Sequence, residues 1–182
     1  MEGQVCYNCA HKSHKEDDIM KKTTVSRLVV TAVFAALIYI GTQFLSFPLA
    51  FGYFNLGDLF ILICAYLIGG AYAPVAAVIG SVTADLLSPY AIYAPATLVI
   101  KALMAIVVIL LCRRGRASAF RFTLSAVLAE AIMVSGYFLF ETVIYGVGGA
   151  ISSIPFNLLQ GGAAVVLSTV VVLFLRRIKI KF

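Results

Sequence analysis

The positive charges of this chain are confined to three short stretches, and the sequence between them is almost continuously hydrophobic. Of the 14 Lys and Arg residues, 13 lie in residues 1–27, 113–121 or 176–182, and the exception, Lys101, stands inside an apolar run. With 62% hydrophobic residues and a mean hydropathy of +1.03, the chain has more apolar surface than a soluble domain of 182 residues can bury. The sequence therefore predicts an integral membrane protein.

Six apolar segments are predicted to cross the membrane as helices, because a spanning helix needs about 20 mostly apolar residues. Cutting the chain at Pro, Gly and charged residues gives the ranges 28–47, 56–73, 74–87, 96–112, 122–145 and 156–175. The third segment is short, and its border with the second depends on Gly69, Gly70 and Pro74. We expect an all-α membrane protein in two parts, a cytoplasmic tail over residues 1–22 and a six-helix transmembrane domain over residues 23–182.

The orientation follows from the side on which the basic clusters fall. With six spans, the amino-terminal tail, the connection 113–121 and the carboxyl terminus all lie on one side, which the positive-inside rule assigns to the cytoplasm. The other connections, residues 48–55, 88–95 and 146–155, contain no Lys or Arg. We therefore expect both termini in the cytoplasm. This topology and anionic lipid account for the net charge of +6, so nucleic acid is not an expected partner.

The amino-terminal tail carries a compact set of potential metal ligands. Its pattern is C-x2-C-x-H-x2-H, formed by Cys6, Cys9, His11 and His14. These are ligand types that bind zinc, although four ligands within nine residues would make a tight cage. The alternative is a polar, disordered tail without metal. Met20, followed by two lysines, would also serve as a starting residue, so the sequence leaves open whether residues 1–19 belong to the protein.

Ionisable side chains inside the predicted spans are costly, so each is a candidate for function. Those residues are Asp58, Asp85, Lys101, Glu130 and Glu141. In the predicted orientation, all except Glu130 lie in the outer half of the membrane and come from different helices. Lys101 is about five residues into its span, a depth of roughly 8 Å at 1.5 Å per residue. The pattern predicts a polar binding site near the outer face.

Structural roles are the alternative for the acidic residues. Asp58 follows an Asn-Leu-Gly sequence and suits the first turn of a helix, where a carboxylate meets free backbone amides. The acids could also pair with Lys101. Because Lys101 is too deep to be an interface residue, we expect it to contact a ligand. Glu141 has Tyr137 one turn away on the same helix face.

Aromatic and amide side chains flank the same outer region. Phe44, Phe47, Phe51, Tyr53 and Phe54 surround the first outer loop, and Tyr90 and Tyr93 lie in the second. They predict a stacking wall over a heteroaromatic ligand, with an aromatic belt at the membrane surface as the alternative. The complete set of expected ligand contacts is Lys101, Glu141, Asn157, Tyr53, Asp58, Asp85, Tyr93, Tyr137 and Gln160.

The order of these motifs resembles the substrate-binding S component of an energy-coupling factor (ECF) transporter. The resemblance covers residues 20–182 and is strongest to the riboflavin, pyridoxine and hydroxymethylpyrimidine type. It is carried by Ala32-x-x-x-Ala36, the Asn-Leu-Gly-Asp sequence at 55–58, the Gly69-Gly70 and Pro74 break, and the sequence Ala-Pro-Ala-Thr-Leu-Val-Ile-Lys at 94–101. Small residues four apart on a helix let another helix approach closely.

The resemblance implies a vitamin-binding subunit in the plasma membrane of a prokaryote. Such a subunit shares a membrane coupling protein and two cytoplasmic ATPases, so ATP would be used by the partners and this chain would need no cofactor. The ligand would lie beneath the first outer loop, in contact with Lys101, Glu141 and Asn157. The small-residue face, Ala32 and Ala36, would meet the coupling protein while the whole subunit topples in the membrane.

Two other classes of function fit the sequence less well. An enzyme is not expected, because both His residues lie in the tail and no nucleophile has a His partner in the spans. A stand-alone carrier or channel is the alternative, with Glu130 available for proton coupling. The side chains favour a pyridoxine or hydroxymethylpyrimidine type of ligand over riboflavin. Thiamine and biotin stay open.

Overall fold

A computed structural model describes residues 24–48, 53–112 and 117–178 of the chain. The chain divides into two compact units, residues 1–30 and residues 31–182. The described part of the first unit is the helical stretch 24–30, which opens a helix over Thr24–Gln43. The predicted zinc ligands, Cys6, Cys9, His11 and His14, lie outside the described residues.

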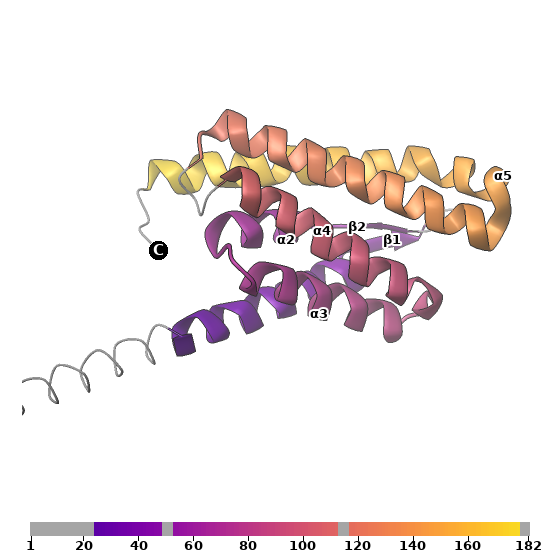
Figure 1. The fold of residues 1–182 in the computed structure, drawn as a ribbon, viewed down its shortest axis with the longest axis horizontal. Coiled ribbons are helices and arrows are strands. Elements are labelled where there is room, and N and C mark those ends of the chain that lie inside the picture. Colours follow the sequence, from indigo (N-terminus) through magenta and orange to yellow (C-terminus); the bar gives the residue numbers. More distant parts are fainter. Residues whose placement is uncertain (1–23, 49–52, 113–116, 179–182) are drawn as a thin grey trace, which may run out of the picture. The chain divides into compact units, whose positions relative to one another are not determined.

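The second unit is built mainly from helices, as predicted (Figure 1). After the first helix come α2 (Gly57–Leu67), α3 (Tyr72–Leu86), the short 3-10 helix η1 (Ala91–Tyr93), α4 (Ala94–Cys112) and α5 (Ala119–Arg177). Thr24–Gln43, Ala91–Cys112 and Ala119–Arg177 are long and apolar enough to cross a membrane, whereas α2 and α3 are shorter apolar helices. The predicted break between the second and third segments is confirmed, since Gly69 and Gly70 have positive φ angles of 61° and 59°.

The connection between the first helix and α2 is a small β-hairpin, which the all-α prediction missed. Strand β1 (Ser46–Pro48) pairs antiparallel with β2 (Tyr53–Asn55), and Phe47 lies opposite Phe54. Strands of three residues carry too few side chains to show an alternating pattern, so the sequence could not distinguish them from a loop. The hairpin places Asn55 directly before the start of α2.

Helix α5 is a pair of antiparallel arms joined at Gly146, where φ is 77° and the helical conformation is interrupted (Figure 1). The arms lie side by side, because Thr123 and Thr169 are hydrogen-bonded at 3.2 Å and each is 23 residues from Gly146. The prediction of a loop over residues 146–155 was wrong. The second arm begins immediately after Gly146 and includes Pro155, because one glycine with positive φ is enough to reverse the chain.

Small residues allow the helices of this unit to pack closely. A Cβ atom on Gly80 of α3 would lie 2.6 Å from the carbonyl oxygen of Ala35 and 2.8 Å from Ile38. At Gly136 of α5, a Cβ would meet Ile100 of α4 at 2.7 Å. Gly80 meets backbone and therefore has no room for a side chain, whereas a side chain at position 136 would require Ile100 to move.

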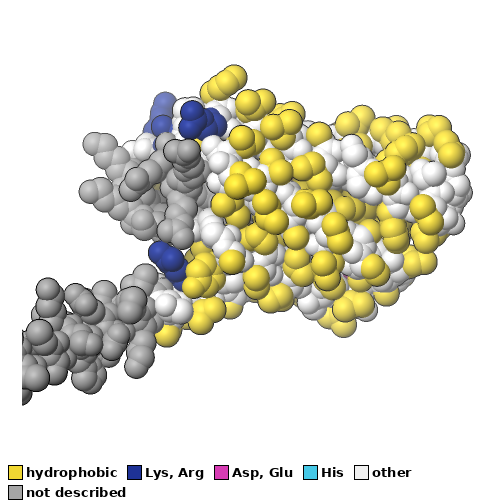
Figure 2. All heavy atoms as spheres, viewed as in Figure 1, with side chains coloured by type: hydrophobic (Ala, Val, Ile, Leu, Met, Phe, Trp, Pro, Cys, Tyr) yellow, Lys and Arg dark blue, Asp and Glu magenta, His cyan; other side chains and the backbone are white. Residues whose placement is uncertain are grey.

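The surface of the second unit divides into an apolar flank and a basic end. Figure 2 shows hydrophobic side chains spread over the visible face, with Lys and Arg side chains gathered at one end of the unit. Arg176 donates a hydrogen bond to the carbonyl oxygen of Ala117, which holds the last turn of α5 beside its own beginning. We call this part of the second unit the basic end. It contains Arg121, Arg176 and Arg177, together with Ala117, which accepts the hydrogen bond from Arg176. An apolar surface that ends in a cluster of basic residues is typical of a membrane protein.

Candidate functional site

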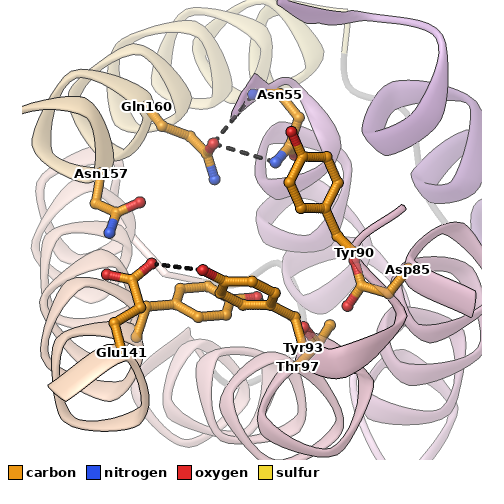
Figure 3. Close-up of a pocket in the computed structure, with 9 residues that line it drawn as sticks. Asn55, Asp85, Tyr90, Tyr93, Thr97, Glu141, Asn157 and Gln160 are labelled. Atoms are coloured by element: carbon orange, nitrogen blue, oxygen red, sulfur yellow. Dashed lines mark hydrogen bonds between the residues drawn. The ribbon is translucent and has the colours of Figure 1, made fainter. Parts of the chain in front are cut away.

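A polar pocket lies among the helices of the second unit (Figure 3). Its lining comes from β2, α3, η1, α4 and both arms of α5, namely Asn55, Asp85, Tyr90, Tyr93, Thr97, Tyr137, Glu141, Asn157 and Gln160. Glu141 lies 20 residues along α5 from Arg121, about 30 Å at 1.5 Å per residue. The pocket and the basic end are thus separated by a distance close to the thickness of a bilayer core.

One wall of the pocket is aromatic. The Tyr93 ring lies 6.3 Å from the Tyr90 ring, 6.2 Å from that of Tyr137 and 5.4 Å from that of Phe140, measured between centroids. These spacings and tilts are typical of favourable aromatic pairs. The Tyr137 hydroxyl shares a 3.0 Å hydrogen bond with the hydroxyl of Thr97, which fixes the ring against α4.

Glu141 joins this wall to the second arm of α5. The Tyr93 hydroxyl donates to one carboxylate oxygen of Glu141 at 3.3 Å, as Figure 3 shows, and the hydroxyl of Ser153 donates to the other. Glu141 is buried but lines the pocket. Each carboxylate oxygen of Glu141 therefore accepts a hydrogen bond, and the orientation of the side chain is fixed by η1 and by the second arm of α5.

Gln160 organises the opposite wall. Its carbonyl oxygen accepts hydrogen bonds from the backbone amide of Asn55 at 3.0 Å and from the Asn55 side-chain amide at 3.1 Å (Figure 3). Its own amide donates to Asp58 at 2.7 Å. The side-chain oxygen of Asn55 in turn accepts from the backbone amide of Gly57 at 3.0 Å, at the beginning of α2. Gln160 therefore links β2, α2 and the second arm of α5.

Lys101 lies one turn deeper along α4 than Thr97 and forms a buried ion pair. Its ammonium is 2.5 Å from a carboxylate oxygen of Asp58, and the two side chains are 5% and 0% exposed. The ammonium also lies 5.4 Å from the centroid of the Tyr137 ring, within the range of a cation–π interaction. Lys101 and Asp58 thus support the pocket from beneath and do not belong to its lining.

Glu130 and Asn157 both have buried polar atoms without a hydrogen-bond partner among the described residues, but only Asn157 lines the pocket. Both carboxylate oxygens of Glu130 are buried and have no hydrogen-bond partner among the described residues, and the side chain packs against Gly161 outside the pocket lining. The amide nitrogen of Asn157 also has no partner in the described part of the chain, but Asn157 lines the pocket. A buried donor without a partner costs free energy, and a ligand acceptor would recover it.

The structure brings most of the expected ligand contacts together from α3, η1 and the two arms of α5. Asp85, Tyr93, Tyr137, Glu141, Asn157 and Gln160 line the pocket. Lys101 and Asp58 form an ion pair beneath the pocket, as in the alternative prediction that an acidic residue pairs with Lys101. Tyr53 lies in β2. Whether any of these residues binds a ligand stays a prediction.

Sequence reasoning left four contributors out of its set of expected contacts. These are Asn55, Tyr90, Thr97 and Ser153. Tyr90 and Asn55 had detectable signals in the sequence. Tyr90 stands beside Tyr93 in the connection predicted over residues 88–95, and Asn55 begins the Asn-Leu-Gly-Asp sequence. Ser153 had none, because small hydroxyl residues are common in helices of membrane proteins.

The predicted coupling residues occupy the exposed side of the first helix. Within the second unit, Ala32 and Ala36 are exposed, as are Val33 and Ile40 beside them. Ala35, between them in the sequence, is buried and faces Gly80 of α3. The helix therefore uses one small residue for internal packing and leaves the other two on its outer surface.

The ion pair beneath the pocket gives a direct test of its structural role. We expect Lys101→Met to lower the free energy of unfolding by about 3 to 5 kcal/mol, because it leaves Asp58 as a buried, unpaired charge. Adding Asp58→Asn should recover part of the loss, since it removes that charge. Thermal melting of the purified variants in detergent measures both effects. A single variant as stable as the unmodified protein would contradict the role assigned to the pair.

Comparison with known proteins gives two matches. The family model described as "ECF-type riboflavin transporter, S component" matches residues 22–177, most of the chain. A protein of Pyrococcus woesei, described as an uncharacterised protein in the gap 3′ region, is 32% identical over 120 residues, which cover 66% of this chain and 80% of the relative. The chain therefore belongs to the family of S components of ECF-type riboflavin transporters, and it is a membrane component that binds substrate for transport, not an enzyme.

Proposed function

We propose that this protein captures a small heteroaromatic vitamin in the pocket of Figure 3 and presents it to the other subunits of an ECF transporter for ATP-driven uptake. The observation that carries the proposal is Asn157, whose amide nitrogen is buried at the pocket without a partner among the described residues. The aromatic rings of Tyr90, Tyr93 and Tyr137 supply a surface on which a flat ring can stack. Family membership argues against the stand-alone carrier or channel.

Two ligand types follow from different observations. Riboflavin is the substrate in the name of the matching family. A pyridoxine or hydroxymethylpyrimidine type of ligand is favoured by the lining, since Asp85, Glu141 and the amides offer many hydrogen-bonding groups around a small ring. Both types present ring nitrogens or carbonyl oxygens that could accept from Asn157.

The placement of the pocket supports six spans with both termini in the cytoplasm. The two arms of α5, α4 and the first helix are each long enough to span, and α2 with α3 would complete the set as shorter helices. The basic end would face the cytoplasm and the pocket would face outward. A ligand could then be captured from outside the cell.

The exposed small residues of the first helix suit a contact with the coupling subunit. Ala32 and Ala36 lie on a face that the second unit leaves uncovered. Bulk added there would separate two helices without reaching the pocket. Capture and coupling would thus use different surfaces of this subunit.

Ligand titration tests the proposed binding site. The protein purified in detergent should bind riboflavin or pyridoxine, and Asn157→Leu should weaken binding at least about 10-fold, because the ligand acceptor loses its donor. Tryptophan is absent from the chain, so riboflavin fluorescence can be followed without interference from indole. Ala131→Leu, on the exposed side of the first arm of α5, is the control and should not change affinity. Binding that is insensitive to Asn157→Leu would place the ligand elsewhere.

Thiol labelling tests the topology. In a background without the four native cysteines, Tyr90→Cys should react with a membrane-impermeant reagent added to intact cells. Arg116→Cys should react only after the cells are opened, because the positive-inside rule places it in the cytoplasm. Labelling of Arg116→Cys in intact cells would reverse the proposed orientation.

Substitution on the first helix separates capture from coupling. Ala36→Leu should abolish most vitamin uptake by the assembled transporter while the isolated subunit keeps its ligand affinity. Ala131→Leu adds the same volume to an exposed position on α5 and should leave uptake unchanged. Loss of affinity together with uptake in a folded Ala36→Leu protein would show that this face supports the pocket.

A further inference from the structure

We infer that the pocket accepts neutral or positively charged forms of its ligand and rejects forms that carry a phosphate or a carboxylate. Asp85 and Glu141 are the residues that set this selectivity. The inference rests on the proposed function, vitamin capture in this pocket, and adds the charge class of the substrate.

The outer half of the protein contains no positive charge that is available to an anion. Between residues 27 and 113 the sequence has one Lys or Arg, which is Lys101, and between residues 121 and 176 it has none. Every residue that lines the pocket lies within these two intervals. The loop between β1 and β2 lies within the first of them as well, so no arrangement of that loop supplies a cation.

Lys101 is already committed to another charge. Its ammonium is bonded to Asp58 at 2.5 Å, and the residue is 4% exposed. Releasing Lys101 to an anionic ligand would leave Asp58 buried with only the Gln160 amide as a donor. The free energy lost by breaking a buried pair is large, so Lys101 is a poor anion site.

The pocket itself carries two acidic side chains. Asp85 and Glu141 come from α3 and from the first arm of α5, and both are buried where they line the pocket. Glu141 accepts hydroxyl hydrogen bonds from Tyr93 and Ser153, which are the contacts of a carboxylate. An anion about 6 Å from one such charge, at an effective dielectric constant of about 20, is disfavoured roughly 100-fold.

Donors and acceptors in the lining point to the same ligand class. The amide nitrogen of Asn157 is a donor that has no partner among the described residues, whereas the carboxylate oxygens of Asp85 and Glu141 are acceptors in the lining. A neutral heterocycle with hydroxyl or amino groups satisfies both, and a protonated ring also gains from the acids and the tyrosine faces. A phosphate has only acceptors at neutral pH and would meet the carboxylates directly. Phosphorylated vitamins outside the cell must therefore pass through a phosphomonoester hydrolysis before this subunit can capture them.

Paired titrations test this inference on the purified protein. Riboflavin is compared with riboflavin 5′-phosphate, and pyridoxine with pyridoxine 5′-phosphate, at one pH and ionic strength. For whichever vitamin binds, we expect its phosphate ester to bind at least about 100-fold more weakly. Glu141→Gln, which keeps the side-chain shape, should reduce that ratio about 10-fold. Asp85→Asn provides a second variant if Glu141→Gln does not fold.

Glu130→Gln is the matched control, because Glu130 is a buried acid that lies outside the pocket lining. It should leave the ratio of the two affinities unchanged. Equal affinity for a vitamin and its phosphate would overturn the inference while vitamin capture stands. If neither vitamin nor either ester binds, the proposed function fails and the inference fails with it.

Discussion

The buried ion pair of Lys101 and Asp58 is the interaction on which the rest of the site depends. Two opposite charges without solvent access are tolerated only when their remaining hydrogen bonds are satisfied. Asp58 meets this condition through Lys101 on one oxygen and Gln160 on the other. Since Gln160 also holds Asn55, one carboxylate fixes the relative positions of α2, α4, β2 and the second arm of α5. The hydrogen bonds that neutralise and satisfy Asp58 therefore also position Gln160 and Asn55 in the pocket lining.

The hairpin of α5 completes the site from the other side. Its reversal at Gly146 brings Ser153 against Glu141, so that one helix arm positions the acid of the other. Tyr93 reaches the same carboxylate from η1. The aromatic wall and the acid are therefore positioned together, and a change in the bend at Gly146 would move both.

Basic and acidic side chains gather at different ends of the second unit, and this separation bears both on its orientation in the membrane and on the charge of the ligand it can bind. Arg121 and Arg176 lie at the basic end, while Asp85 and Glu141 lie at the pocket. The same absence of Lys and Arg that lets the positive-inside rule orient the chain leaves the pocket without a free cation. An S component with this distribution would distinguish a vitamin from its phosphate ester without any dedicated contact to the phosphate.

The sequence by itself determined the membrane class, the main helices, the break at Gly69 and Gly70, and the end of the molecule where polar groups collect. Those properties are local, because hydropathy, glycine and charge act within one segment. Tertiary structure decided the partners: Lys101 with Asp58 across 43 residues and Gln160 with Asp58 across 102. It also left the amide nitrogen of Asn157 without a partner among the described residues. It also decided that Lys101 supports the pocket from below. The sequence placed several acids within reach of Lys101, and only the packing of α2 against α4 selects one.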